Sequence, residues 1–184
     1  MNRDIFSIHP LSRRRLLSSA AILVAGAGLT GCHKAQQYHT DAAQLAAFWA
    51  LRLPAVSPAS GDSEVALTTF RGRPLLVNFW ATWCPPCVAE MPTLSFFYAE
   101  RGAHDWQCLG LAVEDKLEPV ARFLARAPVA YPVALAGLAG TQVSRNLGNT
   151  EGVLPFTVLF DANGNITRRK MGQLQPSDLK TWLG

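Results

Sequence analysis

Two cysteines separated by two prolines lie between an apolar run and a stretch with helical spacing, and this arrangement constrains the fold of the 184-residue chain. Residues 73–81 are almost continuously apolar, which predicts a strand buried on both faces. Apolar spacing over residues 87–101 predicts a helix, so the cysteines fall in a strand-to-helix turn. Cys84 then lies near the N-cap and Cys87 at the third helical position, and their sulfur atoms can meet on one side of the first turn.

This turn has the chemistry of thiol–disulfide exchange. The partial positive charge at a helix N-terminus favours a thiolate at Cys84, and Cys87 supplies a second thiol behind it. Zinc sites use the same spacing, but they normally need a second pair of ligands, and the sequence has no other C-x-x-C and no His-x-x-x-His. A structural disulfide rarely lies in such a turn behind an exposed tryptophan, here Trp83. We therefore expect an exposed nucleophile at Cys84 and a shielded resolving thiol at Cys87.

The remaining pattern predicts one α/β domain. Strands are expected at 47–53, 64–70, 106–113, 131–135, 156–160 and 166–171, and helices at 119–127, 141–147 and 177–183. This order implies a central mixed sheet with helices on both faces. Hydrophobic residues make up 49% of the chain and charged residues 16%, which excludes a disordered chain.

The N-terminus has the features of an export signal. Arg13–Arg15 precede an apolar run from Leu16 to Gly31, which is shorter than a membrane span needs. The run ends in Leu29-Thr30-Gly31-Cys32, which resembles a bacterial lipobox. We therefore expect a signal peptide over 1–31, a lipid-carrying Cys32 followed by a flexible tether to residue 46, and a domain over 47–184. An uncleaved signal anchor and a buried core helix are the alternatives.

Net charge does not predict a nucleic-acid partner. The chain carries a formal charge of +4, but four arginines and one aspartate lie within residues 1–31, so the rest carries only +1. The basic excess belongs to the leader, and the rest has no basic stripe beyond Arg168-Arg169-Lys170.

The sequence around the cysteines resembles one family closely. The matching segments are residues 78–87 with Glu90-Met91-Pro92, Phe70-Arg71-Gly72-Arg73-Pro74, Leu154-Pro155-Phe156-Thr157 and Asp161-Ala162-Asn163-Gly164. Together they resemble the TlpA/ResA-like branch of the thioredoxin superfamily, over residues 47–184. The resemblance implies a thioredoxin fold with an N-terminal β-hairpin and an inserted strand–helix segment. It also implies a membrane-tethered, extracytoplasmic reductase of protein disulfides, in some members serving cytochrome c maturation.

The resemblance also suggests residues that support the site. Pro155 matches the family's cis-proline beside the disulfide, which leaves Leu154 free to pair with an incoming chain; an ordinary trans proline is the alternative. An acid is expected beneath the disulfide, at Asp115 or, with a one-residue shift, at Glu114. Partial burial would raise its pKa and allow it to relay a proton to Cys87, whereas a solvated charge pair is equally compatible with the sequence. Glu90 is expected on the helix surface.

The prolines between the cysteines favour an electron donor. Pro85 and Pro86 have no N–H to donate to the Cys84 sulfur, so the thiolate is weakly stabilised. The expected cycle needs no bound cofactor or metal, and an upstream membrane thiol reductase restores the dithiol. An oxidase or isomerase could use the same cysteines. A copper-delivery module is a further alternative, although such modules usually separate their cysteines by three residues.

Overall fold

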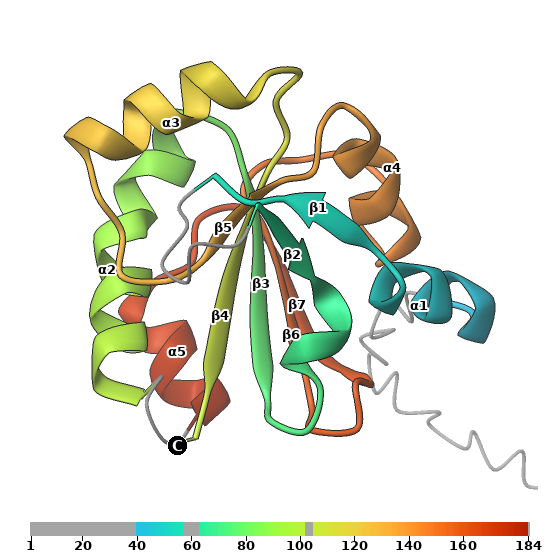
Figure 1. Cartoon of the computed structure of the whole chain (residues 1–184). Coiled ribbons are helices and arrows are strands. Elements are labelled where there is room, and N and C mark those ends of the chain that lie inside the picture. Colours follow the sequence, from blue (N-terminus) through green and yellow to red (C-terminus); the bar gives the residue numbers. More distant parts are fainter. Residues whose placement is uncertain (1–39, 57–62, 102–104, 184) are drawn as a thin grey trace, which may run out of the picture. The chain divides into compact units, whose positions relative to one another are not determined.

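The computed structural model describes residues 40–56, 63–101 and 105–183. A central sheet has the strand order β5-β4-β3-β6-β7, and β1 pairs with β2 in a separate hairpin (Figure 1). The elements in chain order are α1 (Ala42–Trp49), β1 (Arg52–Pro54), β2 (Glu64–Ala66), the 3-10 helix η1 (Leu67–Phe70), β3 (Leu75–Trp80), α2 (Pro85–Arg101), β4 (Gln107–Ala112), α3 (Leu117–Arg126), β5 (Val133–Leu135), α4 (Ala139–Asn146), β6 (Phe156–Phe160), β7 (Ile166–Met171) and α5 (Pro176–Leu183).

The middle of the sheet is formed by β3, which is parallel to β4 and antiparallel to β6. Every residue of β3 and β4 is buried, which explains why these strands are apolar without alternation. Trp80 and Ala112 end the two strands in register, so both strands end at the same edge of the sheet. Four residues separate β3 from α2, and the last of them, Cys84, therefore lies at this edge.

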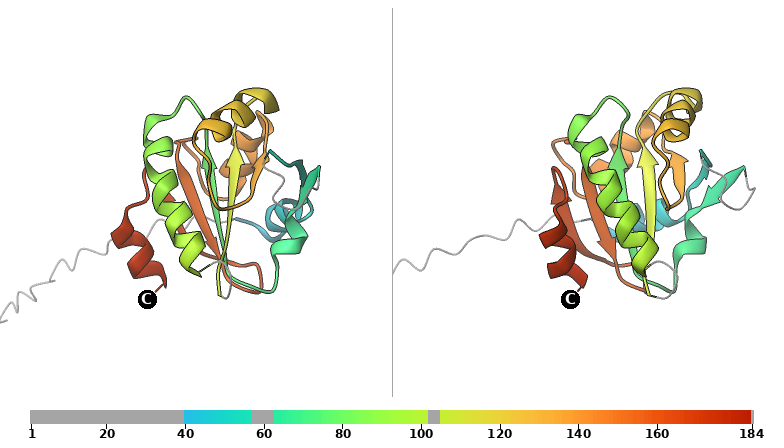
Figure 2. Two further views of the ribbon diagram at one scale, coloured as in Figure 1. Left: turned by 60° about the vertical axis from the view of Figure 1, so that its left-hand side comes forward. Right: turned by 90° about the vertical axis from the view of Figure 1, so that its left-hand side faces the viewer.

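Helices cover both faces of the sheet, as predicted (Figures 1 and 2). One face carries α2, α3 and α5, whose apolar side chains form a cluster with Leu76, Cys108 and Leu159 of the sheet. The other face packs against α1 and α4, around Val77 and Phe79 of β3. The mixed sheet, the helices on both faces and the N-terminal hairpin confirm the predicted thioredoxin-like fold. The strand β5 and the helix α4 lie in the stretch between α3 and β6, where the chain can hold the expected strand–helix insertion.

The start of the domain differs from the prediction. The strand expected over 47–53 is wrong for residues 47–49, which end α1, and only 52–54 form β1. Asp41 caps α1: its side chain accepts a hydrogen bond from the Gln44 amide at 2.7 Å, and the Gln44 side chain accepts one from the Asp41 amide at 3.2 Å. This reciprocal capping box can be read in a sequence, and it was the missed signal.

Burial of its last turn holds α1 on the sheet. Phe48 stacks on Phe160 of β6 with ring centroids 5.1 Å apart, and the Trp49 indole donates a hydrogen bond to the Gly164 carbonyl at 3.0 Å. Residues 42–46, expected in the tether, therefore belong to the domain. The second hairpin strand is also shorter than predicted, because residues 67–70 form η1.

The expectations for the signal peptide, Cys32 and residues 32–39 lie outside the described residues. Within the described ranges, no helix has the length and apolar character needed to cross a membrane.

Candidate redox site

Cys84 and Cys87 form a disulfide, with an S–S distance of 2.02 Å and Cα atoms 5.3 Å apart. Cys84 directly precedes α2 and occupies its N-cap position, because its carbonyl accepts the amide of Val88 at 3.1 Å. Cys87 is the third residue of the helix, as the spacing predicted. The first turn of α2 therefore brings the two sulfur atoms together.

A shallow groove runs past Cys84 but does not reach Cys87. Its lining comes from the cysteine turn with the start of α2, the end of β4, α4 with its N-cap, and the loop before β6: Trp83, Cys84, Pro85, Pro86, Val113, Leu138, Thr141, Ser144, Gly152 and Leu154. Trp83 and Leu138 are exposed, at 68% and 70%. Cys84 is only 5% exposed, so the expectation of an exposed cysteine at the helix start is wrong for the disulfide form. Cys87 is fully buried, and the groove gives access to Cys84 alone.

The loop before β6 contributes a cis peptide bond between Leu154 and Pro155. Pro155 is buried, and its carbonyl accepts a hydrogen bond from the Gly172 amide at 2.8 Å. Leu154 lines the groove beside Cys84. The cis conformation expected from the resemblance is therefore present, and it lies next to the redox pair.

The buried acid of the site is Glu90, and the expectation that Glu90 lies on the helix surface is wrong. Glu90 follows Cys87 by three residues, so both lie on the face of α2 that packs on the sheet. Its two carboxyl oxygens accept hydrogen bonds from the Asn78 side chain at 2.7 Å and from the Leu174 amide at 2.5 Å. Burial raises the pKa of Glu90 from the usual 4.5 to about 7, although both hydrogen bonds and the charge of Lys170 oppose the rise.

The two acids at the end of β4 have other environments. Asp115 is exposed, so the expectation of a partly buried carboxyl there is wrong. Glu114 is half-buried, and one of its oxygens accepts hydrogen bonds from the Thr82 amide at 2.7 Å and the Thr82 hydroxyl at 2.6 Å. Its carboxyl thus holds the loop that leads into Trp83 and Cys84.

The charge of Glu90 acts on two further buried groups, the free thiol of Cys108 and the phenol of Tyr131. Burial raises the pKa of the Cys108 thiol, and it raises the pKa of the Tyr131 phenol well above its usual value. In both cases the charge of Glu90 adds to the rise. Both groups are therefore neutral at physiological pH. Within the described ranges, no three His, Cys, Asp or Glu side chains gather as a metal site.

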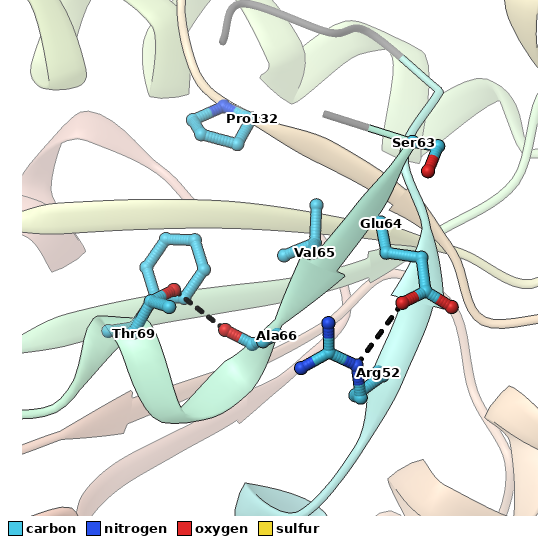
Figure 3. A pocket seen from close by; sticks show the side chains of 8 residues that line it. Arg52, Ser63, Glu64, Val65, Ala66, Thr69 and Pro132 are labelled. Atoms are coloured by element: carbon cyan, nitrogen blue, oxygen red, sulfur yellow. Dashed lines mark hydrogen bonds and ion pairs between the residues drawn. The ribbon is translucent and has the colours of Figure 1, made fainter. Parts of the chain in front are cut away.

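A second hollow lies at the hairpin and shares no lining residue with the groove (Figure 3). Its side chains include the ion pair between Arg52 and Glu64, with 3.1 Å between Nε and Oε2, and Pro132. No cysteine lines this hollow, so the redox chemistry belongs to the groove at Cys84.

Comparisons with known proteins agree with this site. The Redoxin family model matches residues 50–183. The thiol-disulfide oxidoreductase ResA of Geobacillus thermodenitrificans is 32% identical over 120 residues, which cover 65% of this chain and 67% of that protein. The protein of the same name from Bacillus thuringiensis is 25% identical over 173 residues, covering 94% and 97%.

A solved structure extends the likeness to the fold. The crystal structure from Chlorobium tepidum named as a thiol:disulfide interchange protein DsbE has 26% identity and a TM-score of 0.61, and it covers 72% of this chain and 86% of that one. The residues matched by the Redoxin family model, 50–183, contain the Cys84–Cys87 disulfide and the cis-proline loop. The chain therefore belongs to the Redoxin family, as a ResA/DsbE-like thiol–disulfide oxidoreductase of the thioredoxin superfamily.

Proposed function

We propose that this thiol–disulfide oxidoreductase is tethered to a membrane outside the cytoplasm and reduces disulfide bonds in other proteins. The observation that carries the direction is the identity of the first two residues of α2. The side chain of an N-cap residue accepts hydrogen bonds from the amides of the second and third helical residues. The second is Pro86, which has no N–H, so only Cys87 can donate to the Cys84 sulfur. A weakly stabilised thiolate makes the dithiol a better electron donor.

The reaction cycle uses both cysteines. The Cys84 thiolate attacks one sulfur of the substrate disulfide, and the other substrate sulfur leaves as a thiolate that takes up a proton. Cys87 then loses its proton and attacks the Cys84 sulfur, which releases the second substrate thiolate. Two electrons have passed to the substrate, and Cys84 and Cys87 are again a disulfide. An upstream membrane thiol reductase returns the pair to the dithiol.

Glu90 is the proposed proton acceptor for Cys87. Both residues are buried on the same face of α2, and no solvent reaches the Cys87 sulfur directly. A pKa of about 7 lets the carboxyl accept and release a proton near neutral pH, which suits a relay. Glu114 is proposed to support the site by holding the Thr82 loop.

The groove favours a polypeptide substrate over a small thiol compound. Its lining includes the exposed apolar side chains of Trp83 and Leu138. Leu154 lines the groove and precedes the cis-proline, and its backbone is proposed to pair with an extended substrate chain in the manner of an added strand. An oxidised cysteine pair in an apocytochrome c is one candidate substrate, on the basis of the family resemblance.

The proposed location rests on the leader sequence. The basic residues, the short apolar run and Leu29-Thr30-Gly31-Cys32 together support export and lipid attachment to Cys32. Metabolic labelling with a radioactive fatty acid should mark the wild-type protein and not the Cys32→Ser variant. An unlabelled wild type in a host that labels its other lipoproteins would contradict the lipid anchor.

Redox equilibration with glutathione or dithiothreitol tests the direction. We expect a midpoint potential more negative than about −200 mV, as for thioredoxin-like reductants. Pro86→Ala restores an amide aimed at Cys84 and should raise the potential by roughly 20 mV, the equivalent of one hydrogen bond. Pro85→Ala is the control, because the amide of the first helical residue does not point at the N-cap side chain. A wild-type potential near −120 mV, typical of strong oxidants, would contradict the reductase.

A further inference from the structure

The buried carboxyl of Glu90 is linked to the C-terminal part of the chain as well as to the sheet. One oxygen accepts a hydrogen bond from the Asn78 side chain of β3. The other accepts a hydrogen bond from the amide of Leu174, which lies in the loop between β7 and α5. The loop after β7 and the central strand β3 therefore both hold the carboxyl of an acid that belongs to α2.

An ion pair joins the two elements on either side of this loop. Lys170 of β7 donates to Asp178 of α5, with 2.6 Å between Nζ and Oδ2. The same carboxylate oxygen also accepts a hydrogen bond from the backbone amide of Gln175 at 2.8 Å. The two side chains are only 28% and 24% exposed, so water screens the pair less than it screens a surface pair. The hydrogen bond from Lys170 lowers the pKa of Asp178, which keeps that carboxylate ionised.

The register of the sheet places Lys170 on the Glu90 side. Lys170 pairs with Thr157 of β6, and the Thr157 hydroxyl accepts a hydrogen bond at 3.1 Å from the same Asn78 nitrogen that binds Glu90. Directly paired residues of an antiparallel ladder point to the same face. The Lys170 side chain therefore lies on the face of the sheet that carries Glu90, and Asp178 of α5 holds it there.

We propose that Lys170 is a positioning residue of the redox site, which stabilises the carboxylate form of Glu90 and is itself held in place by Asp178. Through Glu90, Lys170 controls the pH at which Cys87 is deprotonated. This consequence rests on the relay role proposed for Glu90 above.

The charges that face Glu90 agree with this role. From β4 and the segment before β5 come Cys108 and Tyr131, both of which are neutral at physiological pH. From α2 comes Cys87, which is in the disulfide here. Lys170 is the cation that opposes the effect of burial on the Glu90 pKa, and its partner Asp178 brings a partly compensating negative charge.

The test measures the Glu90 carboxyl directly, by carbon-13 NMR of the oxidised full chain as a function of pH. Lys170→Met removes the cation and should raise the pKa of Glu90 by at least roughly half a unit. Lys170→Arg keeps the charge and should restore most of the wild-type value. Lys180→Met is the control, because Lys180 is exposed on α5 and forms no ion pair within the described residues, and it should leave the pKa unchanged.

The inference is overturned if Lys170→Met leaves the Glu90 pKa unchanged, or if Lys180→Met shifts it equally. A pH profile of disulfide reduction separates this inference from the proposed relay. We expect the acid-side midpoint of the rate to move to higher pH in Lys170→Met, by the same amount as the Glu90 pKa. If the Glu90 pKa moves and the rate profile does not, Lys170 still acts on Glu90, and the relay role of Glu90 is wrong.

Discussion

Thr82 donates two hydrogen bonds to a single oxygen of Glu114, one from its backbone amide and one from its hydroxyl, at 2.7 and 2.6 Å. These bonds tie the loop after β3 to the end of β4, two residues before Cys84. Glu114 thus anchors the loop that leads to the first cysteine, and its carboxyl is separate from the hydrogen bonds around Glu90.

Glu114→Ala should disturb both stability and exchange. The Thr82 donors lose a charged acceptor in a half-buried position, so we expect a loss of about 1–2 kcal/mol in the free energy of unfolding and a several-fold slower reduction of a peptide disulfide. The neighbouring Asp115→Ala is the control, because Asp115 is exposed, and it should change the free energy by less than about 0.5 kcal/mol. Urea unfolding and stopped-flow exchange measure the two effects. Equal effects of both substitutions would refute the positioning role of Glu114.

Glu90→Gln should change how stability depends on pH. The carboxyl of Glu90 has a raised pKa, about 7 against 4.5, so the folded state holds its proton more tightly than the unfolded state. Its contribution is therefore fully present below about pH 4.5 and is lost as the pH rises through 7. The difference between wild type and variant should change by roughly 3 kcal/mol across that window, in favour of the variant at high pH.

Chemical denaturation of the oxidised proteins at pH 4.5, 6 and 8 measures this difference. The variant also replaces one carboxyl oxygen with an amide nitrogen, so one of the two donors, Asn78 or the Leu174 amide, loses its acceptor, which lowers the stability by a similar amount at every pH. The prediction therefore concerns the slope of the difference with pH, and parallel curves would show that Glu90 titrates normally.

The parts of the fold that were predicted correctly depend on local patterns. The strands β6 and β7 begin and end at the predicted residues, and β3 and β4 do so within two residues, because buried strands are apolar runs bounded by turn residues. The cysteine turn was also predicted, since the helical position of Cys87 follows from spacing alone. In contrast, α1 was missed because Phe48 and Trp49 suit a strand equally well, whereas the cap at Asp41 and the four alanines of the segment favour a helix.

The burial of Glu90 was not predicted, because it depends partly on a contact with a residue far away in the sequence. A glutamate on a helix is ordinarily exposed, and one of the two hydrogen-bond partners of the buried Glu90, the amide of Leu174, lies 84 residues away in the chain. Two local signals could have identified it: the three-residue spacing from Cys87, and a polar Asn78 in the middle of an apolar strand. Asp115 was favoured for this role because the family resemblance suggests an acid at the end of β4, but Asp115 is exposed and Glu114 is only half-buried.

Leu138→Ser tests the groove as a docking surface for polypeptides. Leu138 is exposed on the wall of the groove, so its removal should raise KM several-fold for a protein disulfide and leave reaction with dithiothreitol unchanged. Phe96→Ser is a matched control, because Phe96 is exposed to the same degree and lies in α2, outside the groove. If both substitutions raise KM equally, the groove has no special part in docking.

The division of labour between the cysteines follows from their different access to the groove. Cys84 lines the groove and Cys87 is buried behind it, so Cys84 should form the bond to the substrate and Cys87 should break it. Cys87→Ser therefore leaves a nucleophile without a resolving thiol. Cys84→Ser leaves a thiol that the substrate cannot reach.

Trapping of mixed disulfides in cells tests this account most directly. Cys87→Ser should accumulate adducts with cell-envelope proteins through Cys84, which disappear on reduction and whose mass spectra identify the substrates. Cys84→Ser should accumulate few adducts, although it also retains one thiol of the pair. Adducts that form mainly through Cys87, or that are absent from both variants, would contradict the exchange mechanism.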